Sequence, residues 1–233
     1  MRINKYIAEA GYCSRREADA LIKKGAVKID GRNALCGDQV TAGMTVTIDG
    51  KVLAPPDRKV YLAYHKPRGV VCTAEKREKN NIMAVLDYPV RVTYAGRLDK
   101  ESEGLLLLTN DGDLIDRLMR GRNGHEREYA VRVDKPLTPD FLKKMKAGIY
   151  LKELDETTRP CKVRRITDRT FEIVLTQGLN RQIRRMCEAC GYHVRELKRI
   201  RIANILLGRL KTGQLRELTA EELQGLFGSL GEE

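Results

Sequence analysis

The chain has 233 residues, which is enough for one large domain or two modest ones with a sizeable core. Hydrophobic residues make up 42% of it and charged residues 33%, a balance typical of a globular protein rather than a disordered one. No segment approaches the roughly 20 consecutive apolar residues of a membrane helix, and the N-terminus lacks the apolar core of a secretory signal. We therefore expect a cytoplasmic protein with no membrane partner.

The six cysteines are scattered along the chain, and in a reducing cytosol we expect them to be free thiols. Cys187 and Cys190 have the spacing of a zinc-binding pair. However, no second Cys or His pair has a matching spacing, and a structural zinc site takes roughly four ligands. The sequence therefore predicts no metal site.

The net charge is +12, and most of the excess lies in one part of the chain. From Arg159 to Arg216 there are 15 Lys and Arg residues against 4 Asp and Glu residues. Such concentrated positive charge favours a polyanionic partner, with nucleic acid first. An anionic membrane is a weaker alternative, because the sequence has no long amphipathic helical pattern. A basic face that contacts only solvent is a further interpretation.

Taken in chain order, the first elements are two short helices. Residues 2–10 have apolar side chains at helical spacing, and Gly11 ends this pattern. Ser14 and Glu17 then have the spacing of a capping box, in which each side chain binds the backbone N–H of the other residue. The helix that they begin should end at Gly25.

Short strands follow at residues 26–30, 45–48 and 51–53, separated by Asp-Gly turns. The run Ala54-Pro55-Pro56-Asp57 cannot continue a helix or a central strand, so we place a domain boundary there. We expect a small first domain at 1–56 and a larger second domain at 59–228.

The second domain mixes strands and helices without a regular alternation. Strand patterns occur at residues 60–65, 105–109, 128–133 and 170–176. Helical patterns occur at residues 114–119 and 141–146, and Thr138-Pro139-Asp140 is a good start for the second of these. This order favours an α+β fold with a mixed sheet.

Asp99 lies in a charged loop between Gly96 and Gly104, directly before the apolar run 105–108. Loops supported by a rigid strand often carry catalytic groups. A carboxylate in such a loop can act as a nucleophile or a base if a nearby arginine keeps it ionised, and Arg97 is two residues away. On local evidence alone, however, a surface Asp in a polar turn is the favoured interpretation.

Residues 181–190 are predicted to form a helix, with Asn180 as its N-cap and Gly191 after its end. Its apolar stripe faces the core and explains the two cysteines as packing residues; it consists of Ile183, Met186, Cys187 and Cys190.

Three arginines near the start of this helix, Arg181, Arg184 and Arg185, oppose the helix dipole. Their position is tolerable if each meets a carboxylate or a phosphate. The next run, residues 194–202, alternates imperfectly and predicts a strand with a cationic face. That face is either an RNA platform or an ordinary charged sheet edge.

The N-terminal module resembles the S4 RNA-binding domain. The resemblance is carried by Arg2-Ile3-Asn4-Lys5-Tyr6-Ile7, by Cys13-Ser14-Arg15-Arg16-Glu17-Ala18 and by residues 27–31. It implies that the two helices lie against structured RNA, with Arg15 and Arg16 contacting phosphates. Arg2 and Lys5 are further candidates for contacts with the RNA backbone.

Three later segments resemble the RsuA branch of bacterial pseudouridine synthases, which act on ribosomal RNA. They are residues 95–112, which include Asp99; residues 125–131, which include Tyr129; and residues 177–186, which include Arg184. With the S4-like module, the resemblance covers almost the entire chain. Residues 134–138 and 180–188 look most like the RluF type, which modifies large-subunit (23S) ribosomal RNA.

The resemblance implies roles for these residues. Asp99 attacks or deprotonates a uridine that has left its stack, Arg184 holds Asp99 ionised and oriented, and Tyr129 stacks on the base. Further RNA contacts are assigned to Arg97, Arg181 and Arg185. We expect no cofactor, because the reaction is an isomerisation, and we expect a monomer. The alternative is a non-catalytic S4-type RNA-binding or ribosome-assembly protein, which would leave the coincidence of the three motifs unexplained.

Overall fold

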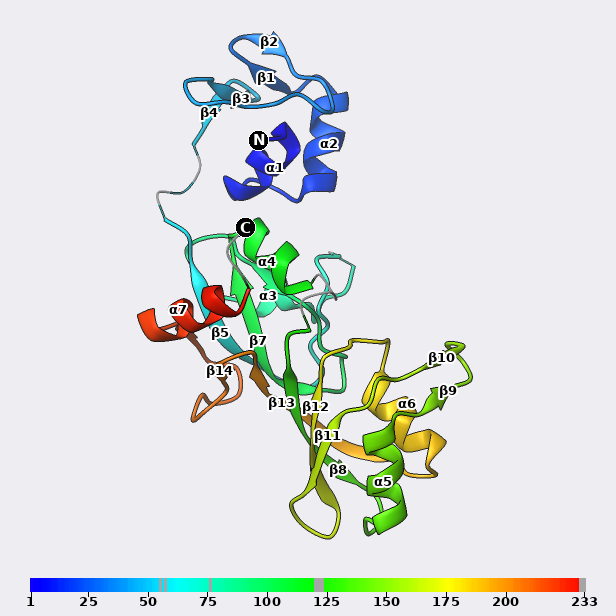
Figure 1. Cartoon of the computed structure of the whole chain (residues 1–233). Coiled ribbons are helices and arrows are strands. Elements are labelled where there is room, and N and C mark those ends of the chain that lie inside the picture. Colours follow the sequence, from blue (N-terminus) through cyan, green and yellow to red (C-terminus); the bar gives the residue numbers. More distant parts are fainter. Residues whose placement is uncertain (55, 57, 76, 120–123, 231–233) are drawn as a thin grey trace.

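The computed structural model describes residues 1–54, 56, 58–75, 77–119 and 124–230, which form a small N-terminal part and a larger main part (Figure 1). The N-terminal part is residues 1–53, and the main part begins at residue 58. Of the predicted break at 54–57, Pro55 and Asp57 lie outside the described residues. The domain limits 1–56 and 59–228 therefore stay a prediction.

In the N-terminal part, helices α1 (Ile3–Glu9) and α2 (Arg15–Lys23) share a core with an antiparallel sheet of order β2-β1-β3-β4. Its strands are β1 (Val27–Ile29), β2 (Arg32–Asn33), β3 (Val46–Ile48) and β4 (Lys51–Leu53). The predicted capping box is confirmed. The Glu17 N–H donates to Ser14 Oγ at 3.2 Å, and the Ser14 N–H donates to a Glu17 carboxylate oxygen at 2.8 Å.

The main part is built on a sheet of order β11-β12-β8-β13-β7-β5-β15, with β14 beside β13 and β6 beside β7. Its strands are β5 (Tyr61–Lys66), β6 (Thr93–Ala95), β7 (Glu103–Thr109), β8 (Arg127–Val133), β11 (Lys162–Arg165), β12 (Thr170–Leu175), β13 (Val194–Ile202), β14 (Ile205–Leu206) and β15 (Leu215–Glu217). Neighbouring strands are antiparallel except β7 and β13, which are parallel. The predicted mixed sheet and α+β fold are confirmed.

The helices of the main part lie around this sheet (Figure 1). They are α3 (Ile82–Val85), α4 (Gly112–Met119), α5 (Pro139–Ala147), α6 (Gln182–Ala189) and α7 (Ala220–Ser229). A small hairpin of β9 (Tyr150–Leu151) and β10 (Glu156–Thr157) lies next to α6. The predicted strands at β5, β7, β8 and β12 and the predicted helices at α4 and α5 are all present.

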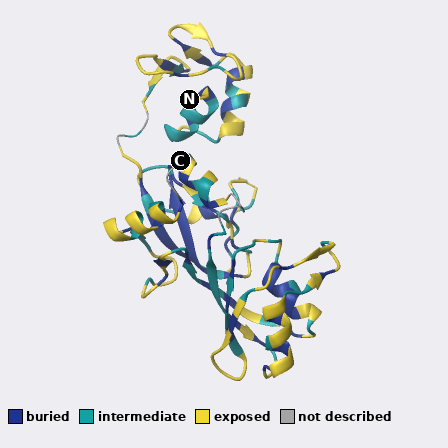
Figure 2. Ribbon diagram, in the orientation of Figure 1, coloured by how far each residue is buried: buried dark blue, intermediate teal, exposed yellow. Residues whose placement is uncertain are grey.

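β7 is buried on both faces because its side chains alternate between two cores. Leu105 and Leu107 pack in a cluster that includes residues of α4 and α7, whereas Leu106 and Leu108 pack in a cluster that includes α3. Figure 2 shows the resulting dark blue colour of β5 and β7. A third core, built around Phe141, fills the opposite end of the sheet beneath α5 and α6. The main part therefore has two halves, which join where β7 meets β13.

At this junction the two strands touch over a very short length, with Lys198 opposite Glu103 and Arg199 opposite Gly104. Gly104 has a φ of +114°, and a Cβ atom there would lie 2.3 Å from the carbonyl oxygen of Arg199. Such an approach excludes any side chain, so only glycine allows the two halves to come this close.

The predicted strand at 194–202 is confirmed as β13. Because β13 lies between β8 and β7, the alternative of a charged sheet edge is excluded. One detail of the sequence prediction is wrong. The helix α6 begins after Arg181, which is its N-cap in a left-handed conformation, and not after Asn180. The Asn180 carbonyl and side-chain oxygens instead accept hydrogen bonds from Arg185. The packing role of Cys187 and Cys190 is confirmed, since both lie in or against the core below α6.

Candidate active site

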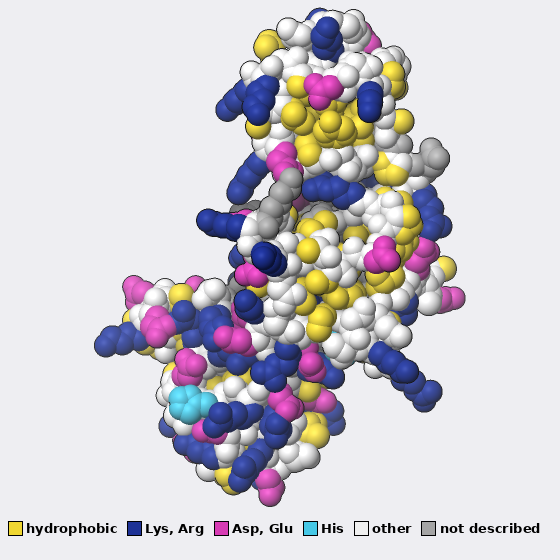
Figure 3. All heavy atoms as spheres, turned by 180° about the vertical axis from the view of Figure 1, so that it is seen from behind, with side chains coloured by type: hydrophobic (Ala, Val, Ile, Leu, Met, Phe, Trp, Pro, Cys, Tyr) yellow, Lys and Arg dark blue, Asp and Glu magenta, His cyan; other side chains and the backbone are white. Residues whose placement is uncertain are grey.

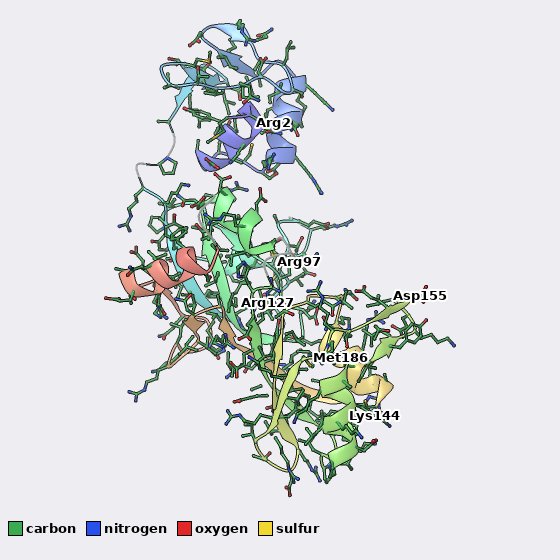
Figure 4. The ribbon with its side chains drawn as sticks, viewed as in Figure 1. Arg2, Arg97, Arg127, Lys144, Asp155 and Met186 are labelled. Carbon is green, nitrogen blue, oxygen red and sulfur yellow. The ribbon has the colours of Figure 1, made fainter. Side chains whose placement is uncertain are left out.

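A cavity of ≈ 540 Å³ lies where the two halves of the main part meet. It is lined by the 96–102 loop, which joins β6 to β7, by β8 and β13, and by residues 175–183, which lead from β12 into α6. Figure 4 places Arg97 of this loop and Arg127 of β8 near the middle of the main part. The volume lies within the range of clefts that bind small organic groups.

Asp99 lines this cavity, and Arg184 approaches the same carboxylate from within the protein. The Nε atom of Arg184 lies 4.0 Å from an Asp99 carboxylate oxygen, with 9% of the Arg184 side chain exposed and 31% of the Asp99 side chain. Arg184 is not among the cavity-lining residues. Burial lowers the pKa of its guanidinium, and the negative charges of Glu101 and Asp99 oppose that change.

Arg184 also holds the 96–102 loop directly. Its Nη2 atom donates to Ser102 Oγ at 3.3 Å and to the Glu101 carbonyl at 3.4 Å. Arg184 therefore places a positive charge beside Asp99 and also holds the loop around Asp99 in position.

Tyr129 stands on β8, opposite Arg199 of β13 and Ile173 of β12. It is half-buried, lines the cavity, and packs against cores in both halves of the main part. Three residues predicted from separate sequence motifs, Asp99, Tyr129 and Arg184, are thus gathered at one place.

Two buried cations that the sequence prediction missed also hold this loop. Lys66 Nζ donates to the Ser102 carbonyl at 2.9 Å and to the Pro67 carbonyl at 2.8 Å. Arg199 donates from Nε to the Leu105 carbonyl at 2.7 Å and from Nη1 to the Arg97 carbonyl at 3.3 Å. Bonds from these cations fix the backbone on both sides of Asp99.

For Arg199 the sequence did contain a signal. It shares one face of its strand with Leu197, and both side chains are buried. A cation on the same face as a core leucine indicates a buried, bonded charge rather than an exposed platform. The predicted cationic face therefore does not include Arg199, whose charge is buried and bonded to backbone carbonyls.

The residues predicted to bind RNA from the main part differ in position. Arg97 and Arg181 line the cavity, and Arg181 also pairs with Glu101 at 3.0 Å. The Arg181 pair lowers the pKa of the Glu101 carboxyl. Arg185 does not line the cavity, and its side chain forms an ion pair with Glu153.

The candidates in the N-terminal part also separate into two groups. Arg2, Arg15 and Arg16 are exposed. Lys5, in contrast, is engaged between the two parts of the chain, because its Nζ atom lies 2.5 Å from an Asp113 carboxylate oxygen of α4 and 3.7 Å from Glu9.

The basic segment 159–216 is not a uniformly positive face. Figure 3 shows acidic side chains among the Lys and Arg side chains of the main part. Ion pairs join many of these charges, including Arg164 with Glu172 and Arg201 with Glu128.

Among the described residues, no cluster of His, Cys, Asp and Glu side chains could hold a metal ion. All six cysteines are free thiols. Within the same residues, no helix is both long and apolar enough to cross a membrane.

Comparison with known proteins identifies the family of the chain. Residues 60–189 match the family model of RNA pseudouridylate synthases, and residues 1–46 match that of the S4 domain. The chain belongs to the RNA pseudouridine synthase family. It is therefore an RNA-modifying enzyme, and its residues 1–46 form an S4 domain.

The dual-specificity RNA pseudouridine synthase RluF of Salmonella typhi is 48% identical over 97% of this chain and 78% of its own length. Its counterpart from Escherichia coli K12 is 47% identical over the same shares of the two chains. The ribosomal large subunit pseudouridine synthase B of Bacillus subtilis is 35% identical over 97% of this chain and 95% of its own. A crystal structure of a pseudouridylate synthase superposes with a TM-score of 0.72 at 30% identity, covering 97% of this chain and 99% of that one.

Proposed function

We propose that this pseudouridine synthase isomerises a specific uridine of 23S ribosomal RNA, with Asp99 as the catalytic nucleophile or base. The observation that carries the role of Asp99 is its position. It is the one carboxylate among the described residues that line the cavity, and Arg184 lies directly behind it. The choice of large-subunit RNA is supported by similarity to a relative that is named for the ribosomal large subunit.

The reaction requires a carboxylate and a uracil base that is held in place beside it. The N1–C1′ bond of the uridine breaks, the base turns, and a C5–C1′ bond forms. C5 then loses its proton and N1 gains one, so the product is an isomer of the substrate and no cofactor is consumed. Asp99 attacks the nucleotide or removes a proton from it, and the Arg184 guanidinium beside it orients the carboxylate.

The target base must leave its stack to reach Asp99, as it does in other enzymes that act on bases. Tyr129 stacks on the base in the cavity, a contact worth about 1–3 kcal/mol. Arg97 and Arg181 bind the RNA at the rim, and the exposed Arg2, Arg15 and Arg16 hold structured RNA against the S4 domain. We place the enzyme in the cytoplasm, where ribosomal RNA is made. We also expect it to act as a monomer.

The substrate is tested with the purified chain and separate transcripts of 23S and 16S ribosomal RNA. Pseudouridines formed in each transcript are mapped at nucleotide resolution. We expect one or a few positions in the 23S transcript and none in the 16S transcript. Modification of the 16S transcript alone would contradict the large-subunit assignment, and RNA binding without any pseudouridine in either transcript would favour a binding protein.

A further inference from the structure

We propose that Arg127 and Arg199 form a binding site for a phosphodiester group of the RNA inside the catalytic cavity. This inference rests on the proposed function, in which the cavity receives a nucleotide. It adds a group that holds the backbone of that nucleotide beside Asp99.

Arg199 lines the cavity, and one nitrogen of its guanidinium has no hydrogen-bond partner among the described residues. This nitrogen is Nη2, and only 2% of the residue is exposed. The Nε and Nη1 atoms are already bonded to the Leu105 and Arg97 carbonyls, so the guanidinium cannot easily turn away. Buried charged donors in folded proteins are almost always paired. An unpaired one in a cavity wall indicates a place for a ligand acceptor.

Arg127 places a second guanidinium at the same wall. It lines the cavity from β8, two residues before Tyr129, and its Nη2 atom donates to the Leu118 carbonyl at 3.3 Å. Burial lowers the pKa of Arg127, and the positive charge of Arg199 nearby lowers it further. Neither arginine forms an ion pair with any described carboxylate. A buried cation, Arg199, and a half-buried one, Arg127, therefore lie close together with no compensating anion among the described residues.

The charge of the missing partner follows from the cavity as a whole. Its described lining contains six cationic side chains and the single carboxylate of Asp99, which is already paired with Arg184. Two of the six, Lys100 and Arg181, pair with Glu78 and Glu101 outside the lining, whereas Arg127 and Arg199 do not pair with a described carboxylate. A neutral acceptor such as a uracil carbonyl would leave both Arg127 and Arg199 uncompensated. The phosphodiester is the anionic group of RNA, and the N–H groups of arginine bind its oxygens through charge-assisted hydrogen bonds. Because Arg199 also fixes the backbone around Asp99, a phosphate held there would set the distance from the nucleotide to the carboxylate.

The first test measures binding of a 23S fragment that contains the modified position, over a range of KCl concentrations. Arg127→Gln should weaken binding at least about fivefold and lower the slope of log affinity against log salt by roughly 0.7–0.9, the loss of one phosphate contact. Arg127→Lys should restore the slope. Arg169→Gln, the same change in the distal turn between β11 and β12, is the control and should leave the slope unchanged.

The second test leaves the protein intact and uses RNAs in which one phosphate next to the target uridine is a neutral methylphosphonate. For one of these RNAs, the affinity for wild type should equal the affinity of the normal RNA for Arg127→Gln. When that RNA is combined with Arg127→Gln, the affinity should fall little further. An unchanged salt slope in Arg127→Gln, or full affinity for every methylphosphonate RNA, would overturn the proposal. Formation of pseudouridine by wild type on the normal RNA is scored separately, so failure of the phosphate site is distinguished from failure of the proposed function.

Discussion

The contact between Gly104 and Arg199 allows a quantitative prediction for Gly104→Ala. The substitution has two costs, because the φ of +114° is strained for alanine and the new methyl group would lie 2.3 Å from one backbone atom of Arg199 and 2.6 Å from another. Backbone strain of this kind costs about 1–3 kcal/mol, and forcing an extra methyl into a packed contact costs about 1–3 kcal/mol. The free energy of unfolding should therefore fall by about 2–6 kcal/mol.

The assay is urea unfolding followed by circular dichroism, with thermal unfolding as a second measurement. A domain of this size loses about 2–4 °C of Tm per kcal/mol, so Tm should fall by at least about 4 °C. Gly213→Ala is the matched control, since Gly213 also has a positive φ, +82°, but nothing lies within 4 Å of its added Cβ. It reports backbone strain alone. Equal destabilisation by the two substitutions would refute the idea that Gly104 is required for close approach of the strands.

Two further predictions concern the cavity. Arg184→Gln should lower kcat by about 100-fold or more (about 2.7 kcal/mol) with RNA affinity within a few-fold, because Arg184 supports Asp99 without lining the cavity. Arg184→Lys should recover part of kcat in single-turnover assays, and equal rates for both variants would count against a charge effect. Burial, and then Arg127, lower the pKa of His125 below its ordinary 6.5. The unfolded chain therefore binds more protons just below pH 6.5, and stability falls as the pH drops through that window. Urea midpoints at about pH 7.5 and about pH 5.5 should differ less in His125→Gln than in wild type, and an unchanged difference would exclude His125 as the cause.

Local patterns predicted much of the secondary structure and the packing of its helices. The capping box of Ser14 and Glu17 is a short-range hydrogen-bond pattern, so its outcome depends little on the rest of the fold. The apolar stripe through Met186 and Cys187 likewise predicted which side of α6 is buried.

Features set by long-range contacts were missed or misread. Arg181 takes the N-cap position in a left-handed conformation, where its side chain pairs with the distant Glu101. The local sequence around Asn180 gives no indication of that contact. Arg199 is buried because β13 lies between β7 and β8, a position that depends on the order of the whole sheet.

Some residues of the candidate site were also predicted from the sequence, and others were not. The family resemblance pointed separately to Asp99, Tyr129 and Arg184. The fold places Asp99 and Tyr129 in the wall of one cavity and Arg184 behind Asp99. The sequence did not point to three further residues, Lys66, Arg127 and Arg199. Their hydrogen bonds to backbone carbonyls, and the donor of Arg199 that lacks a partner, depend on the three-dimensional arrangement.

The most direct test of the central claim is the rate of pseudouridine formation by Asp99→Asn, which keeps the shape of the side chain and removes its negative charge. Asp87→Asn is the control, since Asp87 is exposed and outside the cavity lining. On the 23S transcript we expect the single-turnover rate of Asp99→Asn to fall by at least about 1,000-fold, or about 4 kcal/mol, with RNA affinity within about threefold of wild type. Asp87→Asn should retain the wild-type rate. An Asp99→Asn enzyme that forms pseudouridine as fast as this control would contradict the assignment of Asp99 as the catalytic residue.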